Sequence, residues 1–170
     1  MWPSIQIAST RSSSILRPDR EKLRIGIEDP SQPEIRALLE EADTDPGVPA
    51  ASPAARFHVA RDDTGQAVGT GALLMHGAWA ELECMWVAKS HRCKGVSRAI
   101  LDVLEDCAAS EKVRYLRLRT DAGSHAAIAL YKRAGFSPCP PSASCPQDPH
   151  ALFMQKDLQE ASERQKSATD

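Results

Sequence analysis

Apolar and polar residues alternate over positions 23–27, and the alternation ends at Asp29-Pro30. A period of two predicts a strand, because successive side chains of a strand point to opposite faces. Apolar residues then recur at helical spacing over positions 35–42. Ser31 and Glu34 are spaced as a capping box, with a proline inside the first turn, and predict the start of a helix there. We therefore expect the fold to begin with a strand and then a helix.

Three strand-like segments follow, joined by two predicted turns. Positions 57–61 and 66–76 flank Asp63-Thr64-Gly65, a turn in which glycine supplies a positive φ. The second turn contains Gly77, and the next strand covers positions 79–87. These segments predict two consecutive hairpins.

The hydrophobic period changes again after a short basic loop. Over positions 95–107 apolar residues recur at helical spacing, and positions 113–120 alternate as another strand. A serine at the start of positions 124–134 is placed to cap a further helix. Two closing strands are predicted, one that opens at Phe136 and one over positions 151–157.

The element order βαβββαβαββ implies a mixed sheet with helices on its faces, which is an α/β (α+β) architecture. A chain of 170 residues suits one domain with one core. We assign that domain to residues 23–158, after a poorly ordered extension over 1–22 and before a polar tail over 159–170. The extension is rich in Ser and Arg, so a targeting peptide is its alternative interpretation. Residues 43–55, with three prolines and a glycine, are predicted as a substrate-facing loop.

Composition and charge narrow the range of partners. The formal net charge is -2 with acids and bases interspersed, so the sequence lacks the continuous basic face that nucleic-acid binding needs. No apolar run approaches the roughly 20 residues that span a bilayer. We therefore predict a soluble protein with neither nucleic acid nor membrane as a partner. Five cysteines without a CxxC pair fit neither a disulfide framework nor a zinc knuckle, and they favour a reducing cytoplasm.

Two motifs in register resemble those of one enzyme superfamily. Arg92-Cys-Lys-Gly-Val-Ser97 resembles the Q/R-x-x-G-x-G/A motif of the GNAT superfamily of N-acetyltransferases. Downstream, Ala127-Ile-Ala-Leu-Tyr-Lys-Arg-Ala-Gly-Phe136 resembles the family's AixLYxxxGF helix-to-strand junction. Positions 149–158 are similar to the end of one subgroup of small bacterial GNAT enzymes. The resemblance implies a mixed central sheet of about six to seven strands flanked by three to four helices.

The resemblance also implies that the first motif binds the diphosphate of acetyl-CoA, the co-substrate. Backbone N–H groups at a helix N-terminus meet phosphate charge directly, and Gly95 lets the backbone approach closely. Three cations beside it add positive charge near the phosphates. The implied coenzyme-binding residues are Met85, Trp86, Val87, Arg92, Cys93, Lys94, Gly95, Val96, Ser97, Arg98, Ser124 and Tyr131.

Two positions depart from the family pattern. Ser97 stands where the family has Gly or Ala, and Cys93 occupies a position that is often Gly. Because serine is small, we expect weakened rather than lost coenzyme binding. For Cys93, a thiol of lowered pKa at the helix N-terminus is the alternative to a passive small residue, which we favour.

By the same resemblance, the strand that ends at Val87 bulges and its backbone hydrogen-bonds the pantetheine arm. A backbone N–H near Val87 would stabilise the oxyanion. An alkylamine with a pKa near ~10.4 must lose a proton before it attacks, so a carboxylate is expected nearby. Glu81 and Glu83 are predicted to share a face with Met85 and Val87, because they lie two positions apart on this strand. We favour Glu81 as the general base, since the similar subgroup has an acid there; the alternatives are Glu83 and simple exposure to solvent.

Tyr131 matches the tyrosine that, across much of the family, protonates the departing thiolate of coenzyme A. A hydrogen bond could stabilise that thiolate almost as well, since a thiol has a pKa near ~8.5 and a phenol near ~10. Helical spacing alone would instead make Tyr131 a core aromatic beside Ile128 and Leu130. Ser124 stands where many relatives carry an Asn that contacts the coenzyme arm, and we interpret it as the helix cap.

The histidines His91, His125 and His150 lack zincin spacing, so we expect them at the surface and assign no metal. Positions 138–149 resemble the variable loop beside the acceptor site, with a proline content that suggests a stiff wall. Dimerisation is common in similar enzymes and gives a homodimer as one expected assembly.

The combined interpretation is an acetyl-CoA-dependent N-acetyltransferase that acts on a primary amine of a small molecule by direct attack in a ternary complex. A GNAT-fold acyl-CoA binder without turnover is the alternative, motivated by Cys93 and Ser97. A thiol-based redox protein, using Cys93 or the pair Cys139 and Cys145, is a third interpretation.

Overall fold

The computed structural model describes residues 22–42, 52, 54–141 and 148–160. The predicted N-terminal extension up to residue 21, most of the 43–55 loop, Cys145 and the end of the polar tail lie outside these residues. Within the described residues, no helix is both long and apolar enough to cross a membrane.

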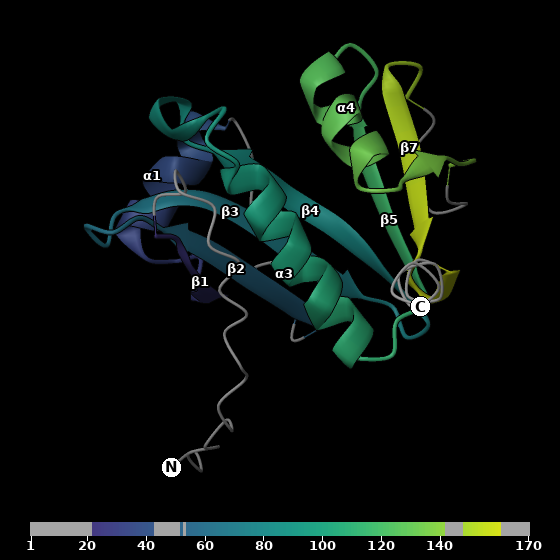
Figure 1. The fold of residues 1–170 in the computed structure, drawn as a ribbon, viewed down its shortest axis with the longest axis horizontal. Coiled ribbons are helices and arrows are strands. Elements are labelled where there is room, and N and C mark those ends of the chain that lie inside the picture. Colours follow the sequence, from purple (N-terminus) through teal and green to yellow (C-terminus); the bar gives the residue numbers. More distant parts are fainter. Residues whose placement is uncertain (1–21, 43–51, 53, 142–147, 161–170) are drawn as a thin grey trace, which may run out of the picture.

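The order of elements agrees with the predicted order βαβββαβαββ (Figure 1). The strands are β1 (Arg24–Ile27), β2 (Ala55–Arg61), β3 (Ala67–Met75), β4 (Trp79–Val87), β5 (Tyr115–Asp121), β6 (Ser137–Pro138) and β7 (Ala151–Asp157). The helices are α1 (Pro33–Glu41), the short 3-10 helix η1 (Lys89–His91), α3 (Val96–Ser110) and α4 (His125–Arg133).

The strands form one seven-stranded sheet in the order β1-β2-β3-β4-β5-β7-β6. All neighbouring strands are antiparallel except β4 and β5, which are parallel. A parallel pair needs a crossover connection, and α3 supplies it. The predicted mixed sheet is therefore confirmed.

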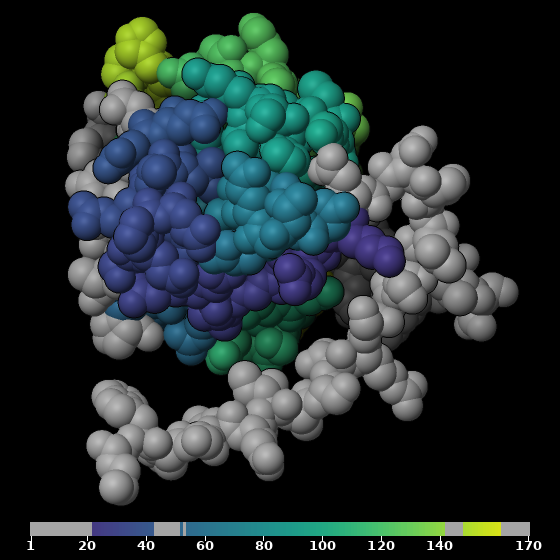
Figure 2. Space-filling view, turned by 90° about the vertical axis from the view of Figure 1, so that its left-hand side faces the viewer, coloured from purple at the N-terminus to yellow at the C-terminus, as the bar shows by residue number. Residues whose placement is uncertain are grey.

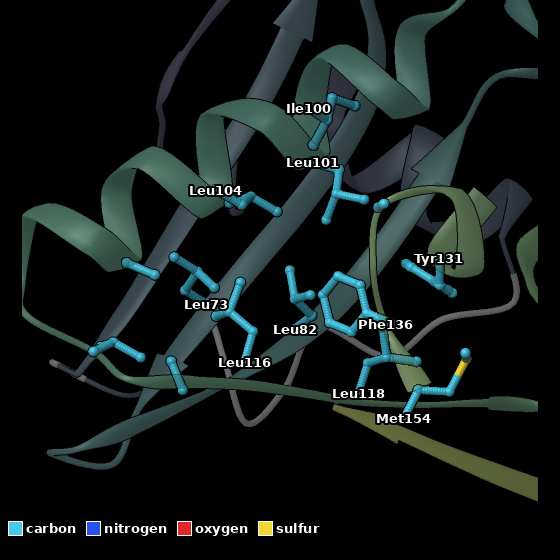
Figure 3. Packing of buried hydrophobic residues seen from close by; sticks show 14 of the residues in the cluster. Leu73, Leu82, Ile100, Leu101, Leu104, Leu116, Leu118, Tyr131, Phe136 and Met154 are labelled. Atoms are coloured by element: carbon cyan, nitrogen blue, oxygen red, sulfur yellow. The ribbon is translucent and has the colours of Figure 1, made fainter. Parts of the chain in front are cut away.

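Helices cover both faces of the sheet. On one face α3 and α4 cover the larger apolar cluster, which includes Leu73, Leu82, Ile100, Leu104 and Leu116 (Figure 3). On the other face α1 packs its buried stripe against β2 and β3 in a second cluster. The surface on the α1 side, formed by β1, α1 and the turn between β2 and β3, faces the viewer in Figure 2.

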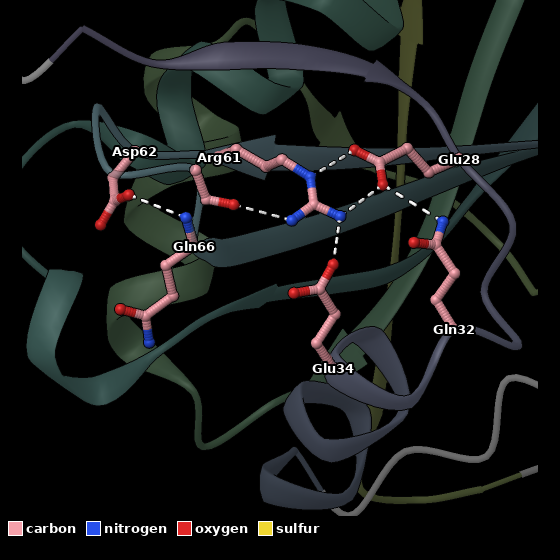
Figure 4. A network of polar contacts seen from close by, with 7 residues as sticks. Glu28, Gln32, Glu34, Arg61, Asp62 and Gln66 are labelled. Atoms are coloured by element: carbon pink, nitrogen blue, oxygen red, sulfur yellow. Dashed lines mark hydrogen bonds and ion pairs between the residues drawn. The ribbon is translucent and has the colours of Figure 1, made fainter.

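Arg61 fastens this second layer to the sheet (Figure 4). Its guanidinium donates to Glu28 at 2.8 and 2.6 Å and to Glu34 at 2.5 Å. The hydrogen bonds to Glu28 lower the pKa of its carboxyl, and together with the bond to Glu34 they join β2 to α1 and to the end of β1. A third donor of the guanidinium reaches the Gly65 carbonyl at 2.8 Å.

The predicted cap of the first helix was wrong in its details. Gln32, not Ser31, precedes the first helical residue, and no side chain caps the helix. The Ser31 N–H donates to Asp29 Oδ1 at 2.8 Å, which forms a local turn instead. Glu34 does not complete a capping box, because its carboxylate accepts from Arg61. The buried stripe itself was predicted correctly, with Ile35, Leu38 and Leu39 facing the sheet.

Candidate active site

Strands β4 and β5 are paired over only half of β4. Residues 79–82 pair with residues 115–118, and from Glu83 onward β4 has no partner on its β5 side among the described strands. Figure 1 shows β4 and β5 diverging beyond their paired segment, with α3 on the β4 side and α4 on the β5 side. Because β5 does not pair with this half of β4, an extended ligand can take the place of a strand beside it.

A bulge interrupts β4 at Cys84, which has a positive φ of 51°. The pairing register between β3 and β4 shifts by one residue there, so Cys84 and Met85 lie opposite Gly71. The Cys84 carbonyl accepts a hydrogen bond from the Thr70 hydroxyl at 2.8 Å, which holds the bulge in place. The bulge expected from the family resemblance is thus present.

The bulge reverses which face of the sheet the side chains occupy. Met85 and Val87 pack against the cluster beneath α3, on the same face as Leu82. Because alternate residues point to opposite faces, Glu81 and Glu83 lie on the other face. Our prediction that the two glutamates share a face with Met85 and Val87 was therefore wrong. The prediction assumed uninterrupted alternation along the strand. The extra residue at the Cys84 bulge shifts the later side chains to the opposite face.

The Val87 amide points toward the side that β5 has left. The N–H of Ala88 donates to the Val68 carbonyl of β3 at 2.9 Å. Adjacent peptide groups of a strand point in opposite directions, so the N–H and C=O of Val87 point away from β3. In agreement, the Val87 carbonyl accepts from Arg92 Nε at 3.2 Å.

The turn before α3 presents a set of free backbone donors. Gly95 has a φ of 81° and precedes the helix, and Cys93 also has a positive φ, of 61°. The first N–H bonded to the helix start belongs to Ala99, which donates to Gly95 at 3.0 Å. Within the described residues, the N–H groups of Gly95, Val96 and Ser97 have no acceptor. A helix N-terminus with free N–H groups is suited to bind a diphosphate.

The cations around this turn differ in how they are engaged. The guanidinium of Arg92 lies over the Trp86 ring, 4.5 Å from its centroid, and donates a hydrogen bond to the Val87 carbonyl. Its side chain is therefore directed back toward the end of β4. Lys94 is exposed. Arg98 pairs with Asp102 at 2.8 Å, so part of its charge is already neutralised. The Val96 side chain is buried, which leaves its backbone as the group that can meet a phosphate.

The prediction that all three histidines lie at the surface holds for two of them. His125 and His150 are exposed. The side chain of His91 is only 14% exposed, and its Nε2 lies 3.5 Å from Asp62 Oδ2. The pair connects the loop before α3 to the turn between β2 and β3. The pairing partner is 29 positions away in the sequence, so helical or strand periodicity gives no sign of it.

Glu81 and Glu83 form a pair of carboxylates on the α1 side of β4. Glu81 Oε2 lies 3.8 Å from Nε2 of His76, which stacks on Trp79. Burial raises the pKa of the Glu83 carboxyl, and the neighbouring charge of Glu81 raises it further. A carboxylate with a raised pKa is a stronger base, which suits the removal of a proton from an ammonium group.

Tyr131 is the buried residue of α4; its ring points into the main apolar cluster and packs edge-on against Phe136 at 5.7 Å between ring centroids (Figure 3). Burial raises the pKa of its phenol to about 12. The ring thus has the packing role that helical spacing indicated, and no hydrogen bond engages its hydroxyl within the described residues. Ser124 precedes α4 as predicted, but its side chain makes no capping hydrogen bond.

The described cysteines do not form a cluster. Cys93 is exposed beside the turn before α3, whereas burial raises the thiol pKa of Cys107 and of Cys139. In the described part of the chain, no group of three or more His, Cys, Asp or Glu side chains is placed to hold a metal ion.

Sequence reasoning missed Arg117 of β5, which lies beside Glu81. Its Cα pairs with Glu81 on β4 and with Gln155 on β7. Side chains of directly paired residues lie on the same face of a sheet, so these three form a row. The alternation over positions 113–120 predicts on which face of its strand Arg117 lies. Only the order of strands in the sheet places it next to Glu81.

Comparisons with known proteins identify this arrangement. The profile of the "Acetyltransferase (GNAT) family" matches residues 20–136. An "IAA acetyltransferase" of Azospirillum brasilense is 36% identical over 110 residues, which are 64% of this chain and 71% of that protein. The uncharacterized N-acetyltransferase YsnE of Bacillus subtilis is 36% identical over 99 residues, which are 53% of this chain and 62% of that protein.

Solved structures agree with the sequence comparisons. A Klebsiella pneumoniae protein described as an acyl-CoA N-acyltransferase has a TM-score of 0.75 at 29% identity, over 81% of this chain and 98% of that one. A GNAT family acetyltransferase of Elizabethkingia anophelis, solved with acetyl-CoA bound, has the same fold, with a TM-score of 0.65 at 13% identity over 79% of this chain and 97% of that one. The chain therefore belongs to the Acetyltransferase (GNAT) family and is an acetyltransferase.

Proposed function

We propose that this protein transfers the acetyl group of acetyl-CoA to a primary amine of a small molecule, by direct attack within a ternary complex. The observation that carries the proposal is the separation of β4 from β5 beside the backbone N–H groups at the start of α3. Two carboxylates, Glu81 and Glu83, lie on the face of β4 that points away from α3. Acetyl-CoA supplies an acetyl group activated as a thioester.

The chain's own groups account for coenzyme binding. The N–H groups of Gly95, Val96 and Ser97 would hold the diphosphate, with Lys94 adding positive charge. The edge of β4 beyond its pairing with β5, which ends at Leu82, would hydrogen-bond the pantetheine arm. The Val87 N–H, which points away from β3, would donate to the thioester carbonyl oxygen as negative charge develops there.

Glu83 and Glu81 would remove the proton from the acceptor ammonium. Glu83 has the raised pKa that a base needs, and it is the first residue of β4 beyond the pairing with β5. Glu81 is the residue that the family resemblance favours. We propose that the pair acts together, one carboxylate accepting the proton while the charge of the other keeps the basicity high.

Tyr131 would donate a hydrogen bond to the departing sulfur. Its pKa of about 12 makes complete proton transfer to a thiolate, with a thiol pKa near ~8.5, an uphill step. A donor that keeps its proton still stabilises the negative charge.

The test is release of free coenzyme A thiol when acetyl-CoA is mixed with a panel of primary amines, alongside calorimetric titration with coenzyme A. We expect both binding and thiol release. Glu83→Gln and Glu81→Gln should each lower kcat/KM. The decrease should be about 10²-fold or more for substitution of the carboxylate that takes the proton. Glu40→Gln, an exposed position on α1, is the matched control and should keep the full rate.

The pH dependence adds a second readout. Because the base must be deprotonated, kcat/KM should rise as pH increases through the raised pKa of Glu83, and this limb should shift in Glu83→Gln. Tight coenzyme A binding without thiol release across the whole panel would instead identify a non-catalytic acyl-CoA binder. Absence of coenzyme A binding would disprove the proposal.

A further inference from the structure

Arg117 stands out among the arginines of the described residues. Three other arginines are half-buried, and each pairs with a carboxylate: Arg56 with Glu111 at 3.8 Å, Arg61 with Glu28 at 2.6 Å, and Arg98 with Asp102 at 2.8 Å. Arg117 is also half-buried, yet no carboxylate among the described residues pairs with it. Partial burial of a guanidinium removes part of its hydration, and a nearby anion normally compensates this cost. Arg117 is therefore placed to bind an anion from outside the described residues.

The Arg117 side chain is held in place by neutral groups. Its Nε donates to Gln155 Oε1 at 2.8 Å, and its guanidinium carbon lies 5.3 Å from the centre of the Trp79 ring. These contacts fix the plane of the guanidinium but use only one of its five N–H donors. The Nη donors remain for a ligand, and their fork geometry matches a carboxylate.

The position of Arg117 relates it to the proposed proton acceptors. Arg117 and Glu81 are paired across β4 and β5, on neighbouring strands about 4.8 Å apart and on the same face of the sheet. Glu83 follows on that face, where β4 and β5 begin to separate. A small molecule that spans Arg117 and the two glutamates would therefore carry an anionic group and an amine a short distance apart.

We propose that Arg117 binds the carboxylate of the acceptor, so that the acceptor is an amino acid or another amine that carries a carboxylate. This inference rests on the proposed acetyl transfer and specifies its substrate class. Binding forms a charge-assisted fork between the Nη donors and the carboxylate, which directs the amine toward Glu81 and Glu83. The prearranged guanidinium loses little freedom on binding, because Trp79 and Gln155 already hold it.

The test compares the KM values of the proteinogenic amino acids and of β-alanine with those of their amides, in which a neutral carboxamide replaces the carboxylate. Wild type should acetylate at least one amino acid with a lower KM than its amide. In Arg117→Met, which keeps much of the side-chain length, KM for that amino acid should rise roughly 10- to 100-fold, while KM for the amide should change little. Arg117→Lys should fall between the two, because it keeps the charge and loses the fork.

Arg114→Met is the matched control. Arg114 precedes β5, pairs with Asp157 at 3.2 Å and is exposed, so this variant should keep the wild-type preference. Circular dichroism and Tm would show that each variant is folded. Because the comparison uses the same two acceptors in every variant, differences in amine basicity cancel.

A binding measurement makes the outcome independent of turnover. Thermal shift of the coenzyme A-bound protein should show greater stabilisation of wild type by the preferred amino acid than by its amide, and no such difference in Arg117→Met. Thiol release with neutral amines but with no carboxylate preference in wild type would overturn the inference and leave the proposed acetyl transfer standing. If no amine gives thiol release, the proposed function fails, and equal shifts with acids and amides would then reject the Arg117 site as well.

Discussion

The Asp62 carboxylate lies 3.5 Å from the His91 imidazole, from Oδ2 to Nε2, and so ties the turn between β2 and β3 to the loop that leads into α3. The other oxygen of Asp62 accepts from the Thr64 hydroxyl at 2.6 Å and from two backbone N–H groups at 3.0 Å. These hydrogen bonds, that of the Thr64 side chain first, lower the pKa of the Asp62 carboxyl. The turn between β2 and β3, which contacts the segment before α3, is therefore itself organised by one ionised side chain.

Asp62→Asn should lower Tm at neutral pH and weaken coenzyme A binding, because the amide cannot accept all of these hydrogen bonds. A carboxyl whose folded-state pKa is lowered stabilises the fold above its unfolded pKa, near ~3.9, and loses this effect as pH falls through the folded value. The Tm difference from wild type should therefore be full at pH 6 and shrink below about pH 4. Asp63→Asn, at the exposed neighbouring position, should match wild type throughout. A Tm difference that stays constant down to pH 2 would refute this assignment.

Gly71 sets the distance between the bulged strand and α3. A Cβ at this position would lie 2.8 Å from Ile100 Cγ2, from Leu104 Cδ1 and from the sulfur of Met85. Gly71→Ala should therefore reduce the free energy of unfolding by about 1–3 kcal/mol through overpacking. Gly26→Ala is the control, since nothing lies within 4 Å of its added Cβ, and its stability should change by less than about 1 kcal/mol. Chemical denaturation measures both, and equal effects of the two substitutions would show that close packing at Gly71 does not matter.

The sequence predicted most of the architecture because local rules decided it. Strands β4 and β7 begin and end at the predicted residues, and Gly65, Gly77 and Gly95 all have the positive φ that their turns require. The helix stripes follow from apolar spacing, which packing against the sheet enforces. Where one local rule acts alone, as in these elements, the pattern is sufficient.

Prediction failed where a distant partner intervened. The predicted capping box is absent: α1 begins after Gln32, and the carboxylate of Glu34 accepts from the distant Arg61. The glutamates change faces relative to Val87, because the extra residue at Cys84 is matched by Gly71 on another strand. Arg117 gains its place beside Glu81 from the order of strands in the sheet. None of these relationships is contained in the spacing of neighbouring residues.

Lys156 and Glu105 form an ion pair that joins β7 to α3. The Nζ–Oε2 distance is 2.8 Å, the side chains are 10% and 14% exposed, and Oε1 of Glu105 has no hydrogen-bond partner among the described residues. Lys156→Met would leave the Glu105 carboxylate buried and unpaired and should cost about 3–5 kcal/mol of stability. The double variant with Glu105→Leu should recover most of this loss, because it removes the stranded charge. Lys132→Met, at an exposed site on α4, is the control.

The same pair gives a pH prediction of opposite sign to that of Asp62. Burial raises the pKa of Glu105, and Lys156 partly offsets the rise. A carboxyl with a raised folded-state pKa costs stability only once it ionises, so the cost is absent below its unfolded pKa, near ~4.3, and appears as pH rises through the folded value. The Tm deficit of Lys156→Met should therefore narrow as pH is lowered from 7 toward about 4.5. A deficit that widens on acidification would contradict this account.

Tyr131→Phe separates the packing role of the ring from the chemistry of its hydroxyl. The ring is 6% exposed and stays in place in the variant, and no hydrogen bond to the hydroxyl is lost within the described residues, so stability should change by less than about 1 kcal/mol. The proposed hydrogen bond to the departing sulfur is lost, so kcat should fall by roughly 10-fold or more. Because the phenol has a pKa of about 12, the wild-type rate should show no decline from its ionisation up to about pH 10. Thiol release measured against pH for both proteins tests this assignment, and a Tyr131→Phe variant that retains the full wild-type rate would leave Tyr131 with a packing role alone.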